Sequence, residues 1–374
     1  MTTWDAIVVG LGGAGSSCAF HLARGGARVL GLEQFGPSHA HGSSHGRTRI
    51  YRTAYSEGIE YVPLVRRARE LWHELQTRSE LPILHPTGAL ILGRRDTRLV
   101  SGAIRSAEAH SLPHEVLLPD AVGERFPQFA LAPDELAVWD PNAGALFAEN
   151  CVLGHATGAA EGGAELHYGE RVRGWSADSA GVSVRTLSGE HRGRSLVLTA
   201  GAWTAGLATG LALPLTIERQ FMLWFPAFDP DLARPDRMPV FLWDRAPQFE
   251  TYGVPDFGDG VKVGTWRGRF SATPEEADRG FTDTEAGPVR SFVERSLPGL
   301  VPRETEATSC LYTNAPDHHF LLGRHPNHPN VIVVSACSGH GFKFTSVIGE
   351  VVARLVRGEP PGYDLSIFDP GRFR

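Results

Sequence analysis

A glycine-rich turn close to the start of the chain constrains its fold more than any other feature of the sequence. The turn runs from Gly10 to Gly15 and fits the pattern Gly-x-Gly-x-x-Gly. It follows a short β-branched run, Asp5–Val9, and precedes Ser16–Arg24, which has the pattern of a helix ending at two glycines. Ala27–Leu32 has the pattern of a second strand, which leads into Glu33. We therefore predict a βαβ unit at this end of the chain.

This unit has the features of a dinucleotide-binding site. The first glycine permits a tight turn, the second lets the backbone approach a pyrophosphate, and the third allows close packing of helix on strand. Glu33 follows about 20 residues later, where a carboxylate accepts hydrogen bonds from an adenosine ribose and would repel a 2′-phosphate. NAD or FAD is therefore expected, and a turn that binds nothing is the alternative. The predicted contacts are Gly10, Gly12, Gly13, Ala14, Gly15, Glu33 and Gln34.

Length and composition exclude several classes of protein. A chain of 374 residues suits two domains, or one domain with a large insertion, and its net charge of −6 gives no electrostatic footprint for nucleic acid. Apolar runs such as Val331–Ala336 are too short to span a bilayer, and the N-terminus lacks a signal-peptide pattern, so we expect a cytoplasmic protein. Four scattered cysteines without a CxxC pair argue against a disulfide framework and a structural zinc site.

The pattern of the remaining chain predicts a mixed α/β fold with two interleaved domains. Helical periodicity covers Tyr61–Ser79 and Phe344–Arg357, and a buried strand is expected at Val331–Ala336. Short strands and loops are expected over Leu81–Asn142 and Pro214–Thr308. We therefore expect a Rossmann-like cofactor domain from residues 1–80, 145–213 and 309–374, and a sheet-rich substrate domain from residues 81–144 and 214–308.

A polar loop follows the βαβ unit. A metal site is disfavoured, because three arginines are poor neighbours for a divalent cation and the loop has no carboxylate or cysteine. Arginines that contact a cofactor or an anionic group are one interpretation, and a solvated basic loop is the other. The polar residues are His39, His41, Ser43, Ser44, His45, Arg47, Arg49 and Arg52.

A second glycine-rich turn near the C-terminus lies between a predicted buried strand and a predicted helix. Its glycines would let the backbone touch a flat ring, and the helix N-terminus would stabilise the negative charge of a reduced flavin. A plain helix-entry turn is the alternative. The residues concerned are Gly339, His340, Gly341, Phe342 and Lys343.

Taken together, these segments resemble the monomeric sarcosine oxidase and N-methyltryptophan oxidase family, within the D-amino-acid-oxidase-like flavoproteins. The resemblance extends over nearly the whole chain, and the turn from Ser338 to Phe344 and the run Cys310-Leu311-Tyr312 are its most specific parts. The other matching segments are Gly10–Gly15, His41–Arg49, Glu60–Leu64 and Ala200–Trp203. FAD is the cofactor that the resemblance implies.

The resemblance implies a covalent flavin. A cysteine at the position of Cys310 carries the flavin in that family, through a thioether to its 8α-methyl group. From the sequence alone a cysteine is more often a small buried hydrophobe, and we keep that interpretation for Cys18, Cys151 and Cys337. The resemblance also assigns cofactor contacts to Ser43, Ser44, Arg49, Gly201, Trp203, Tyr312 and the C-terminal turn.

Further site residues follow from the same resemblance. Lys262 matches a lysine beside the flavin ring that promotes reaction with oxygen, although a strand lysine is usually a solvated edge residue. Arg52 and Lys343 match the pair that binds the substrate carboxylate. Three more positions match groups beside the flavin or in the substrate pocket: His45, Arg49 and Tyr252.

One position departs from the family. Trp266 stands where the sarcosine and methyltryptophan oxidases have a histidine that faces the substrate amine. A tryptophan cannot titrate, is larger, and offers one N–H and a π face to a cation. The substrate is therefore expected to differ from sarcosine itself, and the options are another, sarcosine-like N-methyl amino acid, a cyclic imino acid of the proline or pipecolate kind, or a biosynthetic intermediate. The sequence leaves open which amine and which carbon are oxidised.

The predicted activity is that of a monomeric amine oxidase. We expect a hydride to pass from a secondary-amine amino acid to FAD, and the electrons to pass on to O2, giving an imine and H2O2. One alternative is a dehydrogenase of the same fold that uses an electron carrier, and another is a non-catalytic flavin-binding subunit. An NAD-dependent dehydrogenase would leave the C-terminal turn and Cys310 unexplained.

Overall fold

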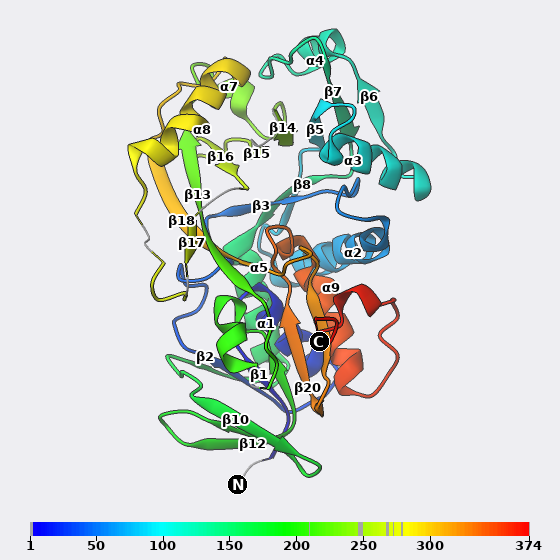
Figure 1. Cartoon of the computed structure of the whole chain (residues 1–374), viewed down its shortest axis with the longest axis vertical. Helices are drawn as coiled ribbons and strands as arrows, with labels where there is room; N and C mark the ends of the chain where they lie inside the picture. Colours follow the sequence, from blue (N-terminus) through cyan, green and yellow to red (C-terminus); the bar gives the residue numbers. More distant parts are fainter. Residues whose placement is uncertain are drawn as a thin grey trace.

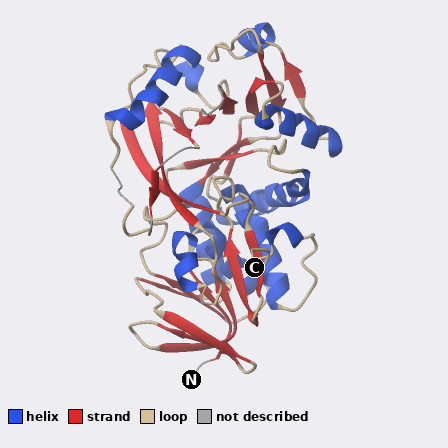
Figure 2. Ribbon diagram, viewed as in Figure 1, coloured by secondary structure: helices blue, strands red, loops and turns tan. Residues whose placement is uncertain are grey.

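The computed structural model describes residues 3–208, 210–245, 250–266, 269–271, 273–277 and 280–373. Three sheets organise these residues, and helices pack against them. In Figures 1 and 2 the first sheet occupies the lower half of the molecule and the second the upper half, and strand β13 runs from one half into the other. The mixed α/β class that the sequence predicts is confirmed.

The first sheet contains the predicted βαβ unit. Strand β1 lies between β2 and β12, and it pairs with both in parallel. Strand β20 pairs in parallel with β12, so the N-terminal, middle and C-terminal parts of the chain share one sheet. The eight strands described are β1 (Thr3–Val9), β2 (Val29–Glu33), β9 (Glu165–Tyr168), β10 (Gly174–Asp178), β11 (Gly181–Arg185), β12 (Glu190–Leu198), β19 (Leu321–His325) and β20 (His328–Ser335).

Long helices cover this sheet. Helix α1 packs against both α5 and α9, and α2 packs on α5 and α9. Their buried faces form one apolar core with β1 and β20, which fixes the start of α1 at the edge where the parallel strands end. The helices are α1 (Gly13–Arg24), α2 (Val62–Ser79), α5 (Ala148–Glu161) and α9 (Thr345–Val356).

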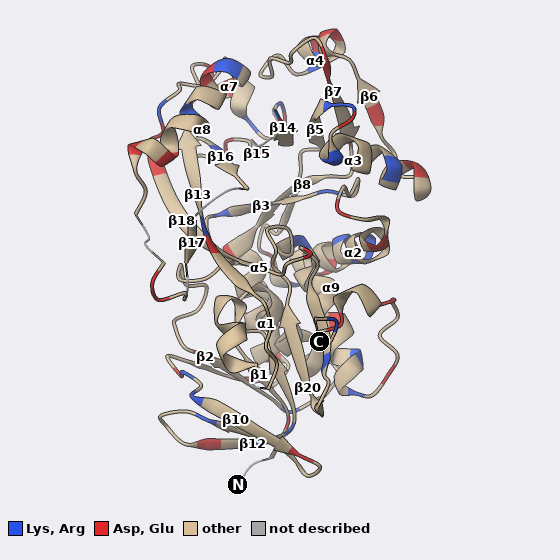
Figure 3. Ribbon diagram, viewed as in Figure 1, with Lys and Arg blue, Asp and Glu red and all other residues tan. Residues whose placement is uncertain are grey.

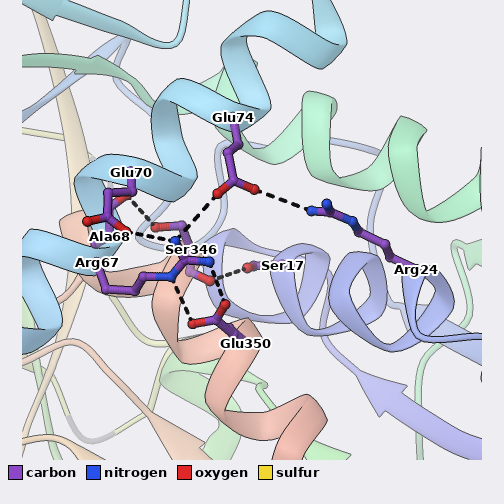
Figure 4. A network of polar contacts seen from close by, with 8 residues as sticks. All are labelled: Ser17, Arg24, Arg67, Ala68, Glu70, Glu74, Ser346 and Glu350. Atoms are coloured by element: carbon purple, nitrogen blue, oxygen red, sulfur yellow. Dashed lines mark hydrogen bonds and ion pairs between the residues drawn. The ribbon is translucent and has the colours of Figure 1, made fainter. Parts of the chain in front are cut away.

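Polar contacts also join these helices. Arg67 of α2 pairs with Glu350 of α9 at 2.7 Å and with Glu74, which also pairs with Arg24 of α1 (Figure 4). The side chain of Ser346 donates to the carbonyl of Ala68 in the same network. The charged side chains of this network are partly exposed, whereas Ser346 and Ala68 are buried where α2 meets α9.

The second sheet is almost wholly antiparallel, and among its described strands only β5 and β14 pair in parallel. A second apolar core, separate from that of the first sheet, lies between this sheet and helix α8. The nine strands described are β5 (Ala89–Arg94), β6 (Glu115–Leu117), β7 (Glu135–Asp140), β13 (Thr216–Phe225), β14 (Val240–Asp244), β15 (Glu250–Val254), β16 (Val261–Thr265), β17 (Arg269–Ser271) and β18 (Glu306–Asn314). Strand β18 therefore crosses the domain boundary that was expected between residues 308 and 309.

Smaller elements complete the described structure. Strands β3 (Thr48–Tyr51), β4 (Leu84–Pro86) and β8 (Gly144–Phe147) form a third sheet between the other two. Short helical segments are η1 (Ile59–Tyr61), η2 (Gly201–Trp203), α6 (Thr204–Leu207), α7 (Pro230–Ala233), η3 (Phe342–Phe344) and η4 (Ser366–Phe368). Charged residues of both signs are scattered over the outer helices (Figure 3). None of the described helices is both long and apolar enough to cross a membrane.

The predicted secondary structure is right for the main elements but misses several helices. The βαβ unit, α2, β20 and α9 are confirmed, with ends shifted by a few residues. The regions expected to hold strands and loops also contain α3 (Arg98–Ala109), α4 (Pro119–Arg125) and α8 (Asp283–Ser296). Proline punctuation suggested loops there. Pro119 is the first residue of α4, where proline is tolerated. Pro288 lies inside α8, where it removes one backbone hydrogen bond of the helix, and the start of α8 is held by a capping box instead.

Candidate active site

A cavity of about 590 Å³ lies where the sheets meet, and it brings together segments from the whole chain. Most of the predicted site residues line it. They are Gly10, Gly12, Gly13, Ala14, Glu33, Gln34, Ser43, Ser44, Arg49, Arg52, Gly201, Trp203, Tyr252, Trp266, Tyr312, Gly339, His340, Gly341, Phe342 and Lys343. Four predicted residues, although described, are not in its wall: Gly15, His45, Lys262 and Cys310.

The glycine-rich turn is shaped by close backbone approaches. Gly10 has φ of +88°, and a Cβ there would lie 2.6 Å from the carbonyl oxygen of Thr199. A Cβ on Gly15 would lie 1.7 Å from the oxygen of Gly10, so this third glycine serves the packing of α1 against the turn. Helix α1 has Gly12 as its N-cap and no acidic residue in its first turn. This end of α1 therefore suits an anionic pyrophosphate.

Glu33 is buried beside this turn. Its carboxylate accepts hydrogen bonds from the N–H groups of Leu11 (2.8 Å) and Phe35 (3.0 Å), and it faces Nε2 of His39 at 3.4 Å. Burial raises the pKa of Glu33, but the hydrogen bonds from His39 and Leu11 lower it by more, so the carboxylate is ionised. A carboxylate has about four acceptor positions, which leaves capacity for ribose hydroxyls. These residues fit the adenosine part of a dinucleotide.

Strand register places predicted residues of the second sheet on one face. Tyr252 of β15 is opposite Leu242 of β14, and both line the cavity. Residues directly opposite each other, and residues two apart on a strand, project to the same side of a sheet. This face continues to Lys262 on the next strand, β16, and then across β13 to Tyr312 and Cys310 on β18. The sheet therefore turns the face that carries these side chains toward the cavity.

Lys262 is buried in the middle of this sheet, not at an edge. It is 2% exposed, and its Nζ donates to the carbonyl oxygens of Gly46 (3.2 Å) and Thr48 (2.5 Å). Burial, and next the charge of Arg49, lower the pKa of Lys262 well below its ordinary value. The ammonium form consequently depends on the carbonyls that face it.

Two more cations lie in the cavity wall. Nζ of Lys343 donates to the carbonyl of His340 at 2.7 Å, and burial together with nearby Arg52 lowers the pKa of Lys343 to about 7. Arg52 is 1% exposed and makes a bidentate ion pair with Glu57, at 2.6 and 2.7 Å. Burial raises the pKa of Glu57, but Arg52 holds it at about 2. The two cations can bind a carboxylate.

Several neighbours of these cations were not predicted from the sequence. The hydroxyl of Tyr55 contacts Nδ1 of His340 at 2.5 Å, and the guanidinium of Arg52 lies 4.5 Å from the Tyr55 ring. The indole of Trp72 donates to the carbonyl of Lys343 at 2.9 Å. No local motif marks such residues, because each acts on a partner that the fold brings near.

The amino-acid composition carries one signal that points to two of the site residues. The chain has 36 lysines and arginines, of which only Lys262 and Lys343 are lysines. Both are buried near the cavity. Lysine changes its pKa readily on burial and arginine does not, so a chain that uses arginine elsewhere marks these two positions as special.

The expectation for Cys337 is wrong. It was expected to be a buried hydrophobe, yet it is only half-buried and lines the cavity. Its sulfur accepts a hydrogen bond from the N–H of Thr313 at 3.3 Å, because the chain leaves β20 at Ser335 and turns toward β18. Cys18, Cys151 and Cys310 are buried.

Comparisons with known proteins agree with this geometry. Residues 5–355 match the family model described as FAD dependent oxidoreductase. The chain is 41% identical to monomeric sarcosine oxidase of Streptomyces avermitilis, over 99% of this chain and 98% of that one. It is 33% identical to N-methyl-L-tryptophan oxidase of Citrobacter koseri, over 99% of each.

Solved structures share the fold. NikD, an unusual amino acid oxidase essential for nikkomycin biosynthesis, superposes in its open form with a TM-score of 0.85 at 25% identity, covering 99% of this chain and 98% of that one. L-Proline dehydrogenase from P. horikoshii gives 0.85 at 21% identity with the same coverage. The resemblance seen in the sequence is thereby confirmed, and the chain belongs to the family of FAD dependent oxidoreductases, as a relative of the monomeric sarcosine oxidases.

Proposed function

We propose that this protein oxidises a small secondary-amine amino acid, an N-methyl or cyclic imino acid, and passes the electrons to dioxygen. The observation that carries the proposal is the pair of buried cations in the cavity wall, Arg52 and Lys343, which share the cavity with the rings of Tyr252 and Trp266. Cations suit a substrate carboxylate, and aromatic rings suit an amine with apolar substituents. The relatives named above act on sarcosine and N-methyl-L-tryptophan, which are both N-methyl amino acids.

The residues that would hold FAD lie in two groups. The Gly10–Ala14 segment and Glu33 suit its pyrophosphate and adenosine, and Tyr312 with the 339–343 turn lies in the part of the wall that suits the flavin. Cys310 is proposed to form the thioether to the 8α-methyl group. The chemistry that bound FAD would supply is uptake of a hydride from the substrate carbon and transfer of the two electrons to dioxygen. The substrate nitrogen loses a proton, so the products are an imine and hydrogen peroxide.

The side chains of the site would bind and orient the substrate. Arg52 and Lys343 would hold the carboxylate, which converts a bimolecular encounter into a positioned one. Trp266 can neither accept nor release a proton, so the substrate amine must reach its neutral form without that residue. Among the described residues that line the cavity, His340 has its Nδ1 bound to Tyr55 and its Nε2 bound to the carbonyl of His318, so neither nitrogen is available as a base.

Lys262 would act in the step with dioxygen. In its ammonium form, Lys262 would stabilise the superoxide produced when dioxygen takes up the first electron. A dehydrogenase of the same fold that uses an electron carrier is the second candidate, and Lys262 is the residue that argues against it. The protein is further proposed to be a monomer with two interleaved domains, one around each large sheet.

Absorption spectra and oxygen consumption test the proposal. The purified protein should be yellow, and the colour should stay with the pellet after acid precipitation, while sarcosine, N-methyl amino acids and L-proline are compared in an oxygen electrode. If acid releases the colour into the supernatant, FAD is not covalently linked to Cys310. Reduction of the flavin by substrate without oxygen uptake would favour the dehydrogenase.

A further inference from the structure

A three-residue turn at Gly46–Thr48 connects the site to helix α5. The N–H of Thr48 donates to the carbonyl of Gly46 at 2.8 Å, a bond that closes a γ-turn around Arg47. Gly46 has φ of +89° and Arg47 has φ of +69°. A γ-turn with a positive φ at a non-glycine residue is strained, so its conformation must be held by contacts outside the turn.

Those contacts come from the first turn of α5. Oε1 of Glu149 accepts hydrogen bonds from the N–H groups of both Gly46 (2.7 Å) and Arg47 (3.0 Å). The N–H of Ala148 donates to the carbonyl of Arg47 at 2.8 Å. A carboxylate that accepts two backbone N–H bonds makes strong, charge-assisted contacts. Glu149 thus holds the two residues that have the unusual backbone conformation.

The opposite side of the same turn faces Lys262. The carbonyls of Gly46 and Thr48 accept from its Nζ at 3.2 and 2.5 Å, and Thr48 also accepts from Arg49 at 2.8 Å. Lys262 lies on β16, inside the second sheet. The two carbonyls of the turn are the hydrogen-bond acceptors of its buried ammonium group. Any movement of the turn would therefore change the place and the protonation of this amine.

We infer that Glu149 is a positioning residue for Lys262: its carboxylate holds the Gly46–Thr48 turn, whose two carbonyls fix the buried ammonium group. The role in the reaction with dioxygen rests on the function proposed above for Lys262. Burial, then Arg49 and Arg47, lower the pKa of Lys262, while Glu149 and Cys310 raise it. Glu149 thus acts on Lys262 through the turn and through its charge.

The lysine composition allows a direct test. With [ε-13C]lysine the holoenzyme gives two signals, because Lys262 and Lys343 are its only lysines, and Lys343→Arg identifies the Lys262 signal. Glu149→Gln should lower the pH midpoint of that signal by about one unit, since a nearby negative charge and the support of the turn are lost. Glu161→Gln makes the same change on the exposed end of the same helix and should leave the signal in place.

Transient kinetics give a second, separate measurement. Glu149→Gln should slow reoxidation of the reduced flavin by about tenfold and change its reduction by less than about twofold. Lys262→Met tests the proposed function on its own: unchanged reoxidation in that variant would refute the oxygen role but leave the signal test valid. Glu149→Asp keeps the negative charge, but its shorter side chain places the carboxylate farther from the turn. The pH midpoint of the Lys262 signal should therefore shift in this variant too. If the pH midpoint of the Lys262 signal is unchanged in both Glu149 variants, the inference is wrong.

Discussion

At the scale of single residues, burial decides what each charged group can do. Lys343 lies 6% exposed beside Arg52, and its pKa of about 7 means that its charge changes within the pH range of an ordinary assay. Arg52 already has Glu57 as an ion-pair partner. Binding of a substrate carboxylate consequently depends on pH through Lys343.

The first prediction concerns this dependence. The depressed pKa means that Lys343 is cationic below about pH 7 and neutral above it, so kcat/KM should fall on the alkaline side. Deprotonation of the substrate amine raises the rate with pH, so the whole profile should be bell-shaped. In Lys343→Arg the guanidinium stays charged, and the falling limb should move above about pH 10. A falling limb that stays in place would assign it to another group.

At the scale of elements, capping explains a helix that the sequence prediction missed. Thr282 and Glu285 form a capping box at the start of α8: the hydroxyl of Thr282 accepts from the N–H of Glu285, and the carboxylate of Glu285 accepts from the N–H of Thr282 at 2.8 Å. Glu285 also pairs with the buried guanidinium of Arg219. The threonine and glutamate spacing is a recognised start signal, which the prolines nearby obscured.

The second prediction tests this cap. Thr282→Ala removes the acceptor and should lower the free energy of unfolding by about 1 kcal/mol. Thr282→Ser keeps a hydroxyl and should retain most of that stability. Urea unfolding followed by circular dichroism measures both. Equal midpoints for the alanine variant and the parent protein would show that tertiary packing of α8 makes the cap redundant.

At the scale of the whole molecule, the cavity joins the two large sheets. Its wall includes the Gly10–Ala14 segment after β1 on one side, and Leu242, Tyr252 and Tyr312 of β14, β15 and β18 on the other. A ligand that spans the cavity therefore contacts both sheets at once. Such a ligand stabilises the folded chain as one cooperative unit, because it binds the native state only.

The third prediction follows from that geometry. Cys310→Ser should bind FAD reversibly, and FAD at about 100 times its Kd should stabilise the variant by about 2.7 kcal/mol. Calorimetry should show one transition at a higher Tm. ADP would contact the first sheet alone and should raise the Tm less. Equal effects of FAD and ADP would mean that the second sheet contributes nothing to cofactor binding.

Features that depend on neighbours along the chain can be predicted from the amino-acid sequence. The βαβ unit is predictable because Gly10 needs a positive φ, and because Gly15 leaves no room for a side chain. The family can be recognised because its motifs are short and ordered. The partners of the buried cations, by contrast, become known from the folded structure alone: Lys262 meets the turn at Gly46 across 216 residues. That contact depends on strand register and on the packing of α5, which no local pattern specifies.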